Sequence, residues 1–140
     1  METKDNLEEV ERIMPEKIMF TLLLDFYNCQ NGAFLTDKEK LNLFIEDLVK
    51  KVDMKPLGAP KVIKAKDSDG DYGYTILRGI YDSALTIHSF YLRRQLNLII
   101  QSCKEFDKNT VIRELKDKVC PDIFNVKFLI QNLEGIKEGK

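Results

Sequence analysis

The stretch Asp82-Ser-Ala-Leu-Thr-Ile-His88 decides how the chain is expected to fold. It leads into the run Leu85–Phe90, and the run Thr75–Tyr81 precedes it. Thr, Ile, Leu, Tyr and Phe dominate both runs, and these residues favour β-strands. The two runs therefore predict an antiparallel hairpin that turns at Tyr81-Asp82. In this hairpin Thr75 lies directly across from His88.

A second hairpin is expected to continue from Phe90, through a turn near Arg93, into the strand Gln95–Cys103. This register places Cys103 across from Ser83, so that two hydroxyls, an imidazole and a thiol share one small area of the sheet. Ser83 and His88 are an odd number of residues apart, and an ideal strand would place them on opposite faces. The shared site therefore requires Ser83 to lie in the turn or at a bulge.

Two amphipathic helices are expected to cover this sheet. Thr36 and Glu39 have the spacing of a capping box, in which the Thr oxygen accepts a backbone N–H and the Glu side chain reaches back. After this box, and again after Asp107 or Asn109, apolar residues recur at helical spacing. These residues are Leu41, Phe44, Ile45, Leu48 and Val52 in the first helix, and Val111, Ile112, Leu115 and Val119 in the second.

Three more strands complete the expected sheet. They are Lys17–Cys29, Ala59–Lys66 and Ile123–Ile130, with a turn at Asn31-Gly32 and a polar tail at Gly135–Lys140. Asp25 interrupts an apolar run, so we expect it at a sheet edge or in a turn. Antiparallel strands with two helices on one face predict an α+β fold, a two-layer α/β sandwich. We expect a single domain spanning residues 1–140, with residues 1–16 as an N-terminal extension.

The composition argues against several classes of partner. The net charge is −1, so there is no basic field for nucleic acid or an anionic membrane surface. No apolar run reaches the roughly 20 residues that span a bilayer, and we expect a cytoplasmic protein. Three cysteines without CxxC spacing indicate neither a disulfide framework nor a zinc site. His88 is the only histidine, and therefore the only imidazole base near neutral pH.

Asp67, Asp69 and Asp71 alternate before the first hairpin, as carboxylates do in calcium-binding loops. Tyr72 stands where such a loop needs glycine, and Arg78 stands where it needs a bidentate glutamate. No metal site is therefore expected. The remaining interpretations are a solvated turn, or a lip that attracts a cationic ligand.

The motif around Ser83 resembles the prokaryotic S-adenosylmethionine decarboxylases. In that family the pattern reads Glu-Ser-His-Leu-Thr-Ile-His, with Gly-x-Ser before it and a Cys twenty residues after the Ser. Here Gly-x-Thr begins at Gly73 and the cysteine is Cys103, so the alignment of this segment needs no gap. The resemblance implies a pyruvoyl-dependent lyase of polyamine (spermidine) biosynthesis that cleaves itself between Asp82 and Ser83. It also implies a homodimer.

The chemistry of decarboxylation explains why such a serine is needed. Loss of carbon dioxide from an amino acid leaves a carbanion, and side chains offer no adequate electron sink for it. Attack of the Ser83 hydroxyl on the preceding carbonyl, followed by β-elimination and hydrolysis, would leave a pyruvoyl group. The resemblance assigns Thr75 to hydrogen-bond the reacting oxygens and His88 to take the Cα proton. It assigns Cys103 to return a proton to the decarboxylated substrate.

Four departures from the family pattern leave alternatives open. Asp82 replaces Glu and Ala84 replaces His beside the cleavage bond. Leu92 stands in place of the carboxylate that would hold ribose, and Asp69 in place of the aromatic that would stack on adenine. The substrate would then be arginine or ornithine, bound by Asp69 and Asp71, rather than S-adenosylmethionine. A further alternative is an unprocessed, inactive relative that binds a small ligand or a partner.

The apolar run Leu96, Leu98, Ile99 and Ile100 gives the sheet more hydrophobic surface than two helices are expected to cover. This surface, like the resemblance, predicts a homodimer.

Overall fold

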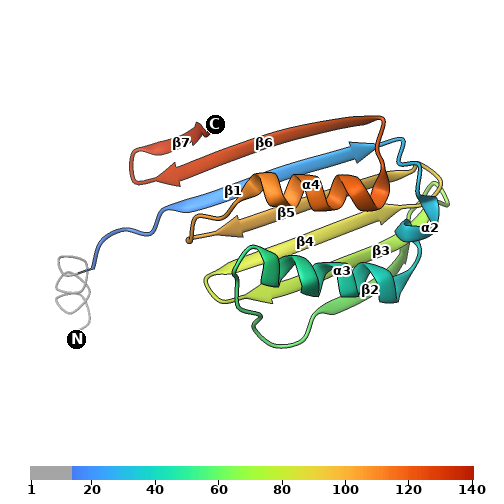
Figure 1. Ribbon diagram of the computed structural model, residues 1–140, viewed down its shortest axis with the longest axis horizontal. Coiled ribbons are helices and arrows are strands. Elements are labelled where there is room, and N and C mark those ends of the chain that lie inside the picture. The colour runs from blue at the N-terminus through green and yellow to red at the C-terminus, as the bar shows by residue number, and fades with distance from the viewer. Residues whose placement is uncertain (1–13) are drawn as a thin grey trace.

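A seven-stranded antiparallel sheet forms the centre of the computed structural model, in which residues 14–140 are described (Figure 1). Its strands lie in the order β2-β3-β4-β5-β1-β6-β7. Their bounds are β1 Met19–Tyr27, β2 Lys61–Lys66, β3 Tyr72–Ile80, β4 Ser83–Phe90, β5 Gln95–Ser102, β6 Ile123–Asn132 and β7 Gly135–Glu138. Most of the expected N-terminal extension, residues 1–13, lies outside the described residues.

Helices α3, Lys38–Lys51, and α4, Lys108–Val119, lie on the same face of the sheet (Figure 1). A one-turn helix, α2, spans Gly32–Leu35 just before α3. The expected α+β fold, a two-layer sandwich of an antiparallel sheet and helices on one face, is confirmed.

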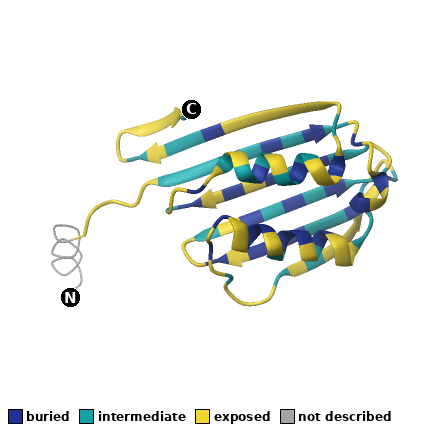
Figure 2. Cartoon of the chain, in the orientation of Figure 1, coloured by how far each residue is buried: buried dark blue, intermediate teal, exposed yellow. Residues whose placement is uncertain are grey.

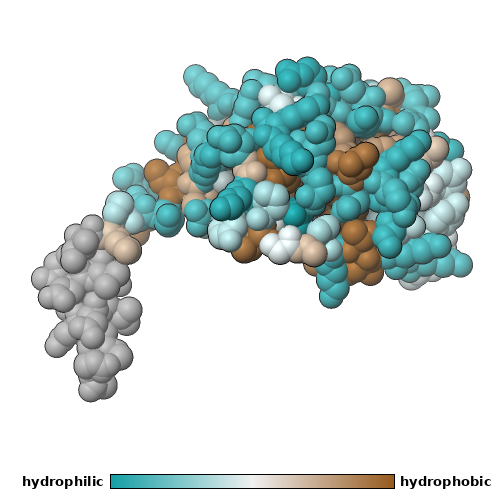
Figure 3. All heavy atoms as spheres, turned by 60° about the horizontal axis from the view of Figure 1, so that its bottom comes forward, coloured by the Kyte–Doolittle hydropathy of each residue, from teal (hydrophilic) through white to brown (hydrophobic). Residues whose placement is uncertain are grey.

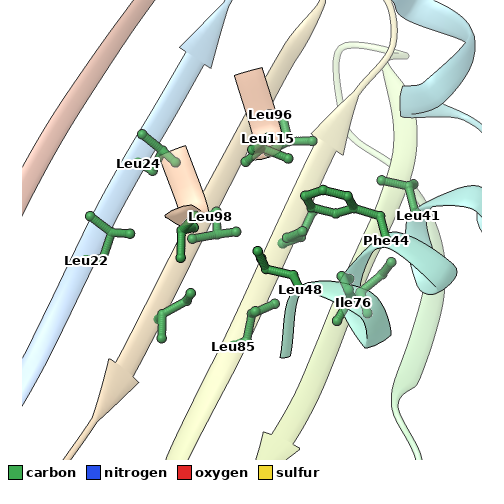
Figure 4. Packing of buried hydrophobic residues seen from close by; sticks show 14 of the residues in the cluster. Leu22, Leu24, Leu41, Phe44, Leu48, Ile76, Leu85, Leu96, Leu98 and Leu115 are labelled. Carbon is green, nitrogen blue, oxygen red and sulfur yellow. The ribbon is translucent and has the colours of Figure 1, made fainter. Parts of the chain in front are cut away.

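The core fills the space between the sheet and these helices. Alternate residues of each central strand are buried beneath the helices, which Figure 2 shows as repeated dark segments. On β4 these residues are Leu85, Ile87 and Ser89. Leucine and phenylalanine side chains from α3 and α4 meet them in close packing (Figure 4). The apolar periodicity of the sequence therefore locates the core correctly.

The opposite face of the sheet has no helix on it among the described residues. Ile63, Leu77 and Ile99 lie on this uncovered face, and each is about two-fifths exposed. The expected apolar surface of the 96–100 run is wrong for three of its four residues. Leu96, Leu98 and Ile100 are fully buried on the helix side, because β5 runs beneath α4 and alternates its side chains between the faces.

The helix cap differs from the sequence prediction. Asp37, not Thr36, is the N-cap of α3, and its carboxylate accepts the Lys40 N–H at 3.0 Å. The Thr36 hydroxyl donates to the Ala33 carbonyl at 3.3 Å instead, because Thr36 ends the unforeseen helix α2. At α4 the cap is Asp107, which accepts the N–H groups of Asn109 and Thr110.

Three further expectations are wrong. Asp25 lies within β1, an interior strand, because it points to the uncovered face and accepts a hydrogen bond from the Asn97 amide. The expected polar tail is largely strand β7, which pairs with β6 from Leu129 to Asn132. The expected turn at Asn31-Gly32 is the start of α2.

The face of the molecule in Figure 3 is largely hydrophilic, with separate hydrophobic patches. Within residues 14–140, no helix has both the length and the apolar character needed to cross a membrane.

Replacing Asp37 with Ala should lower the free energy of unfolding by about 1 kcal/mol, since the variant leaves an N-terminal N–H of α3 without its acceptor. Thr36→Ala, the matched control, should cost less than about 0.5 kcal/mol, because its hydroxyl makes one long bond outside α3. Urea denaturation measures both. A larger loss in Thr36→Ala than in Asp37→Ala would contradict the observed cap.

Candidate functional site

The hairpin of β3 and β4 has the predicted register. Thr75 pairs with His88, and the Thr75 hydroxyl lies 2.9 Å from His88 Nδ1. The strands turn through two residues, Tyr81 and Asp82. Asp82 has φ of +60°, the left-handed region, which short hairpin turns require and which Asp tolerates better than most residues.

Gly73 is needed because the backbones approach closely beside this pair. A Cβ at Gly73 would lie 1.8 Å from the Ser89 carbonyl oxygen. The Ser89 hydroxyl accepts the Tyr74 N–H at 2.9 Å and donates to the Leu35 carbonyl at 2.7 Å. The glycine of the Gly-x-Thr motif therefore has a steric role, and Ser89 ties the hairpin to α2.

A small cavity of about 80 Å³ opens beside the Thr75–His88 pair. Phe90 and Lys66 are among the residues that line it. Asp67 and Asp71 line it as well. The acidic loop, which carries Asp67, Asp69 and Asp71, therefore shares one cavity with the histidine. This proximity joins two features that the sequence presents separately.

A row of polar side chains crosses the uncovered face from the Thr75–His88 pair. By register it continues through Asn97 of β5 to Asp25 of β1 and Asn125 of β6. Asn97 donates to the Asp25 carboxylate. Sequence reasoning did not assign Asn97 or Asp25 to the site. The only signal for them is that each interrupts an otherwise apolar strand.

Ser83 lies away from this row. It is the first residue of β4 and pairs with Ile80 and Ser102, both of which are buried on the helix side. His88 lies on the other face, five residues or roughly 16 Å along the strand. The expected common site of Ser83, His88 and Thr75 does not form within one chain, because β4 is regular and has no bulge to reverse its alternation.

The expected pairing of Cys103 with Ser83 is wrong by one residue. Ser102 lies across from Ser83, and the Ser83 hydroxyl donates to the Ser102 hydroxyl at 2.6 Å. Cys103 follows the end of β5 and is half-buried, and its N–H donates to the Asp82 carbonyl at 3.1 Å. Cys103 therefore contacts the predicted cleavage bond through its backbone.

The three cysteines are free. Burial raises the pKa of Cys29 to about 11, so this thiol stays protonated at neutral pH.

Arg93 binds the three aspartates of the acidic loop. Its guanidinium lies 2.6 Å from Asp67, 2.7 Å from Asp69 and 3.0 Å from Asp71. These carboxylates therefore serve a structural purpose, and binding of a substrate by Asp69 and Asp71 stays a prediction. Within residues 14–140, no three His, Cys, Asp or Glu side chains are arranged to hold a metal ion.

Asp71 is the buried member of this loop, with 3% of its surface exposed. It accepts the backbone N–H groups of Tyr72, Leu92 and Arg93, and so fixes the turn between β4 and β5. Burial alone would raise the pKa of Asp71, but these three N–H groups and the Arg93 guanidinium hold the pKa below its ordinary value.

Asp71→Ala should lower the free energy of unfolding at pH 7 by about 2–3 kcal/mol, because three N–H groups lose a charged acceptor. A lowered pKa stabilises the fold above the ordinary value near 4 and loses this effect as pH falls through the folded value. The gap between wild type and variant should therefore narrow below about pH 4. Asp69→Ala, at an exposed carboxylate, should cost less than about 1 kcal/mol. Equal losses in both variants, measured by denaturation, would contradict this assignment.

Comparison with known proteins identifies the family of the chain. The model of the S-adenosylmethionine decarboxylase family matches residues 21–131. The fold is similar to that of the adenosylmethionine decarboxylase from Aquifex aeolicus VF5, with a TM-score of 0.64 and 12% sequence identity, over 81% of this chain and 90% of that one. Among curated proteins there is no match to the chain. Since the family model covers most of the sequence, the chain belongs to the S-adenosylmethionine decarboxylase family.

Proposed function

We propose that the chain is a pyruvoyl-dependent amino-acid decarboxylase that cleaves itself between Asp82 and Ser83. The observation that carries the proposal is the pair of hydrogen bonds made by the two residues of this peptide bond. Its carbonyl oxygen accepts the Cys103 N–H, and the Ser83 hydroxyl is held by Ser102. A hydrogen bond to a carbonyl oxygen stabilises the negative charge that develops there during attack.

The residues present fit the formation of a pyruvoyl group. Ser83 supplies the hydroxyl, and Asp82 supplies a carbonyl in an exposed, left-handed turn where the chain can part. The pyruvoyl group supplies the electron sink that decarboxylation needs. The part of His88 is to remove the Ser83 Cα proton during elimination, and its Nδ1 is oriented by the Thr75 hydroxyl. The part of Cys103 is to return a proton to the product.

The proposed function makes a direct prediction about cleavage. Incubated wild-type protein should give two chains on denaturing gels, residues 1–82 and 83–140, and the second should be blocked to N-terminal sequencing. Ser83→Ala should stay full length, because the residue directly after Asp82 then has no hydroxyl to attack the carbonyl. Intact mass of the purified protein reads both results.

The alternative proposal is an unprocessed, inactive relative that binds a small ligand or partner. The separation of Ser83 from His88 on opposite faces favours it. Wild-type protein that remains a single chain after long incubation would establish this alternative and end the proposal of an enzyme.

We propose that the chain forms a homodimer and that groups from both copies complete the site. The uncovered face supplies apolar contact through Ile63, Leu77 and Ile99. The Thr75–His88 pair lies on the same face, where a second copy would cover it. In such a dimer the proposed role of the pair is to act on the backbone Cα proton of the partner's Ser83, since the Ser83 hydroxyl points to the helix side.

Mixing variants tests this arrangement. His88→Ala alone should stall in cleavage, and Ser83→Ala alone cannot cleave. When the two are co-expressed, the His88→Ala chain should cleave, because the partner supplies an intact histidine. Light scattering should give a dimeric mass at micromolar concentration. A monomeric mass, or no cleavage in the mixture, would refute a shared site.

The proposed substrate is an amino acid with a cationic side chain. Asp67 and Asp71 of the acidic loop line the cavity beside His88 together with one cation, Lys66. The three carboxylates of the loop outnumber the single Arg93 guanidinium that binds them. Leu92, whose N–H binds Asp71, is exposed and stands where the family pattern has a carboxylate. These features favour arginine or ornithine over S-adenosylmethionine, and the amine product fits polyamine biosynthesis.

Release of carbon dioxide from arginine, ornithine and S-adenosylmethionine should be compared with cleaved protein. Turnover of S-adenosylmethionine should be the weakest, since each lost adenosine contact is worth about 1–3 kcal/mol. Asp69→Ala should reduce turnover of the basic amino acids, most clearly at low salt. Efficient turnover of S-adenosylmethionine alone would overturn this choice of substrate.

A further inference from the structure

Three consecutive residues, Ser102 to Lys104, hold the predicted cleavage bond. The Ser102 hydroxyl accepts a hydrogen bond from the Ser83 hydroxyl at 2.6 Å. The Cys103 N–H donates to the Asp82 carbonyl at 3.1 Å. The Lys104 N–H in turn donates to the Ser102 hydroxyl at 2.9 Å. The attacking oxygen and the carbonyl that it attacks are therefore both held by one short segment that begins at the last residue of β5.

We propose that Ser102 is a positioning residue for self-cleavage at Asp82–Ser83. The inference rests on the proposed function and adds to it a residue that acts through Ser83. Its oxygen accepts the hydrogen bond that Ser83 donates, which fixes the side chain of Ser83 and raises the electron density on the Ser83 oxygen, while the Lys104 N–H holds the Ser102 side chain in place. Thr75, the hydroxyl assigned from the family pattern, is paired with His88 on the other face.

The surroundings of the two hydroxyls strengthen this hydrogen bond. Ser102 is fully buried, and the register places Ile80 on one side of the serine pair and Phe20 on the other. Because apolar neighbours exclude water, a hydrogen bond there is stronger than one at the surface. The Ser83 hydroxyl consequently has one defined partner within the described residues.

The step that Ser102 assists is the shift of the peptide to an ester. A bond forms between the Ser83 oxygen and the Asp82 carbonyl carbon, and the bond from that carbon to the Ser83 nitrogen breaks. The proton of the hydroxyl ends on the nitrogen, which becomes a free amine, so no other reactant is consumed. Elimination then removes the Cα proton and releases the Asp82 carboxylate, and water converts the resulting dehydroalanine to pyruvoyl and ammonia.

Cleavage rates of four proteins test the inference: wild type, Ser102→Ala, Ser102→Thr and Asp37→Ala. Ser102→Ala should slow cleavage by about tenfold or more, the effect of losing one hydrogen bond to a reacting group. Ser102→Thr keeps the hydroxyl and should restore most of the rate. Asp37→Ala weakens the fold at a distant helix cap and should cleave at the wild-type rate, which separates loss of position from loss of stability.

Hydroxylamine cleaves esters, and it shows which step is slowed. The Ser102→Ala protein should contain no more ester than wild type, because the substitution slows the step that forms the ester. Ester that accumulates in Ser102→Ala, or an unchanged cleavage rate while wild type cleaves, overturns the role of Ser102 alone. The role is also overturned if Ser102→Thr is as slow as Ser102→Ala. Wild type that never cleaves overturns the proposed function, and the inference with it.

Discussion

The alternation of side chains along β4 is the constraint on which the rest of the structure depends. Odd-numbered residues from Leu85 onward enter the core beneath the helices, and even-numbered residues such as His88 point to the uncovered face. The hydrophobic effect fixes this choice, since a shift by one residue would expose the whole apolar set. Core packing therefore fixes the face on which each reactive residue lies, and it places Ser83 and His88 on different faces.

Much of the fold follows from residues whose pattern is local. Strand composition and a short polar turn place Thr75 across from His88, and helical spacing identifies the faces of α3 and α4. The partner of Ser83 does not follow, because it depends on how many residues the turn after Phe90 contains. A difference of one residue there exchanges Cys103 for Ser102. Register across a loop is a tertiary property, and sequence composition does not determine it.

The acidic loop shows a different limit. Alternating aspartates suggest an open site for a cation, yet Arg93, more than twenty residues away in sequence, supplies that cation from within the chain. Asp71 also satisfies three N–H groups of its own turn and the next one. A carboxylate that organises backbone donors has the same sequence pattern as one that awaits a ligand. Only the folded structure shows whether a carboxylate binds backbone N–H groups or is free to bind a ligand.

The position of β4 inside the sheet determines how the proposed cleavage would affect the stability and refolding of the protein. A break at the two-residue turn would sever the chain between strands that lie side by side, while β4 stays bonded to β3 on one edge and to β5 on the other. The folded state would lose almost nothing. The unfolded state would gain the freedom of two separate chains, so the cleaved protein would have a larger entropy of unfolding. Recovery from unfolding would also become a reaction between two molecules, and its yield would depend on concentration.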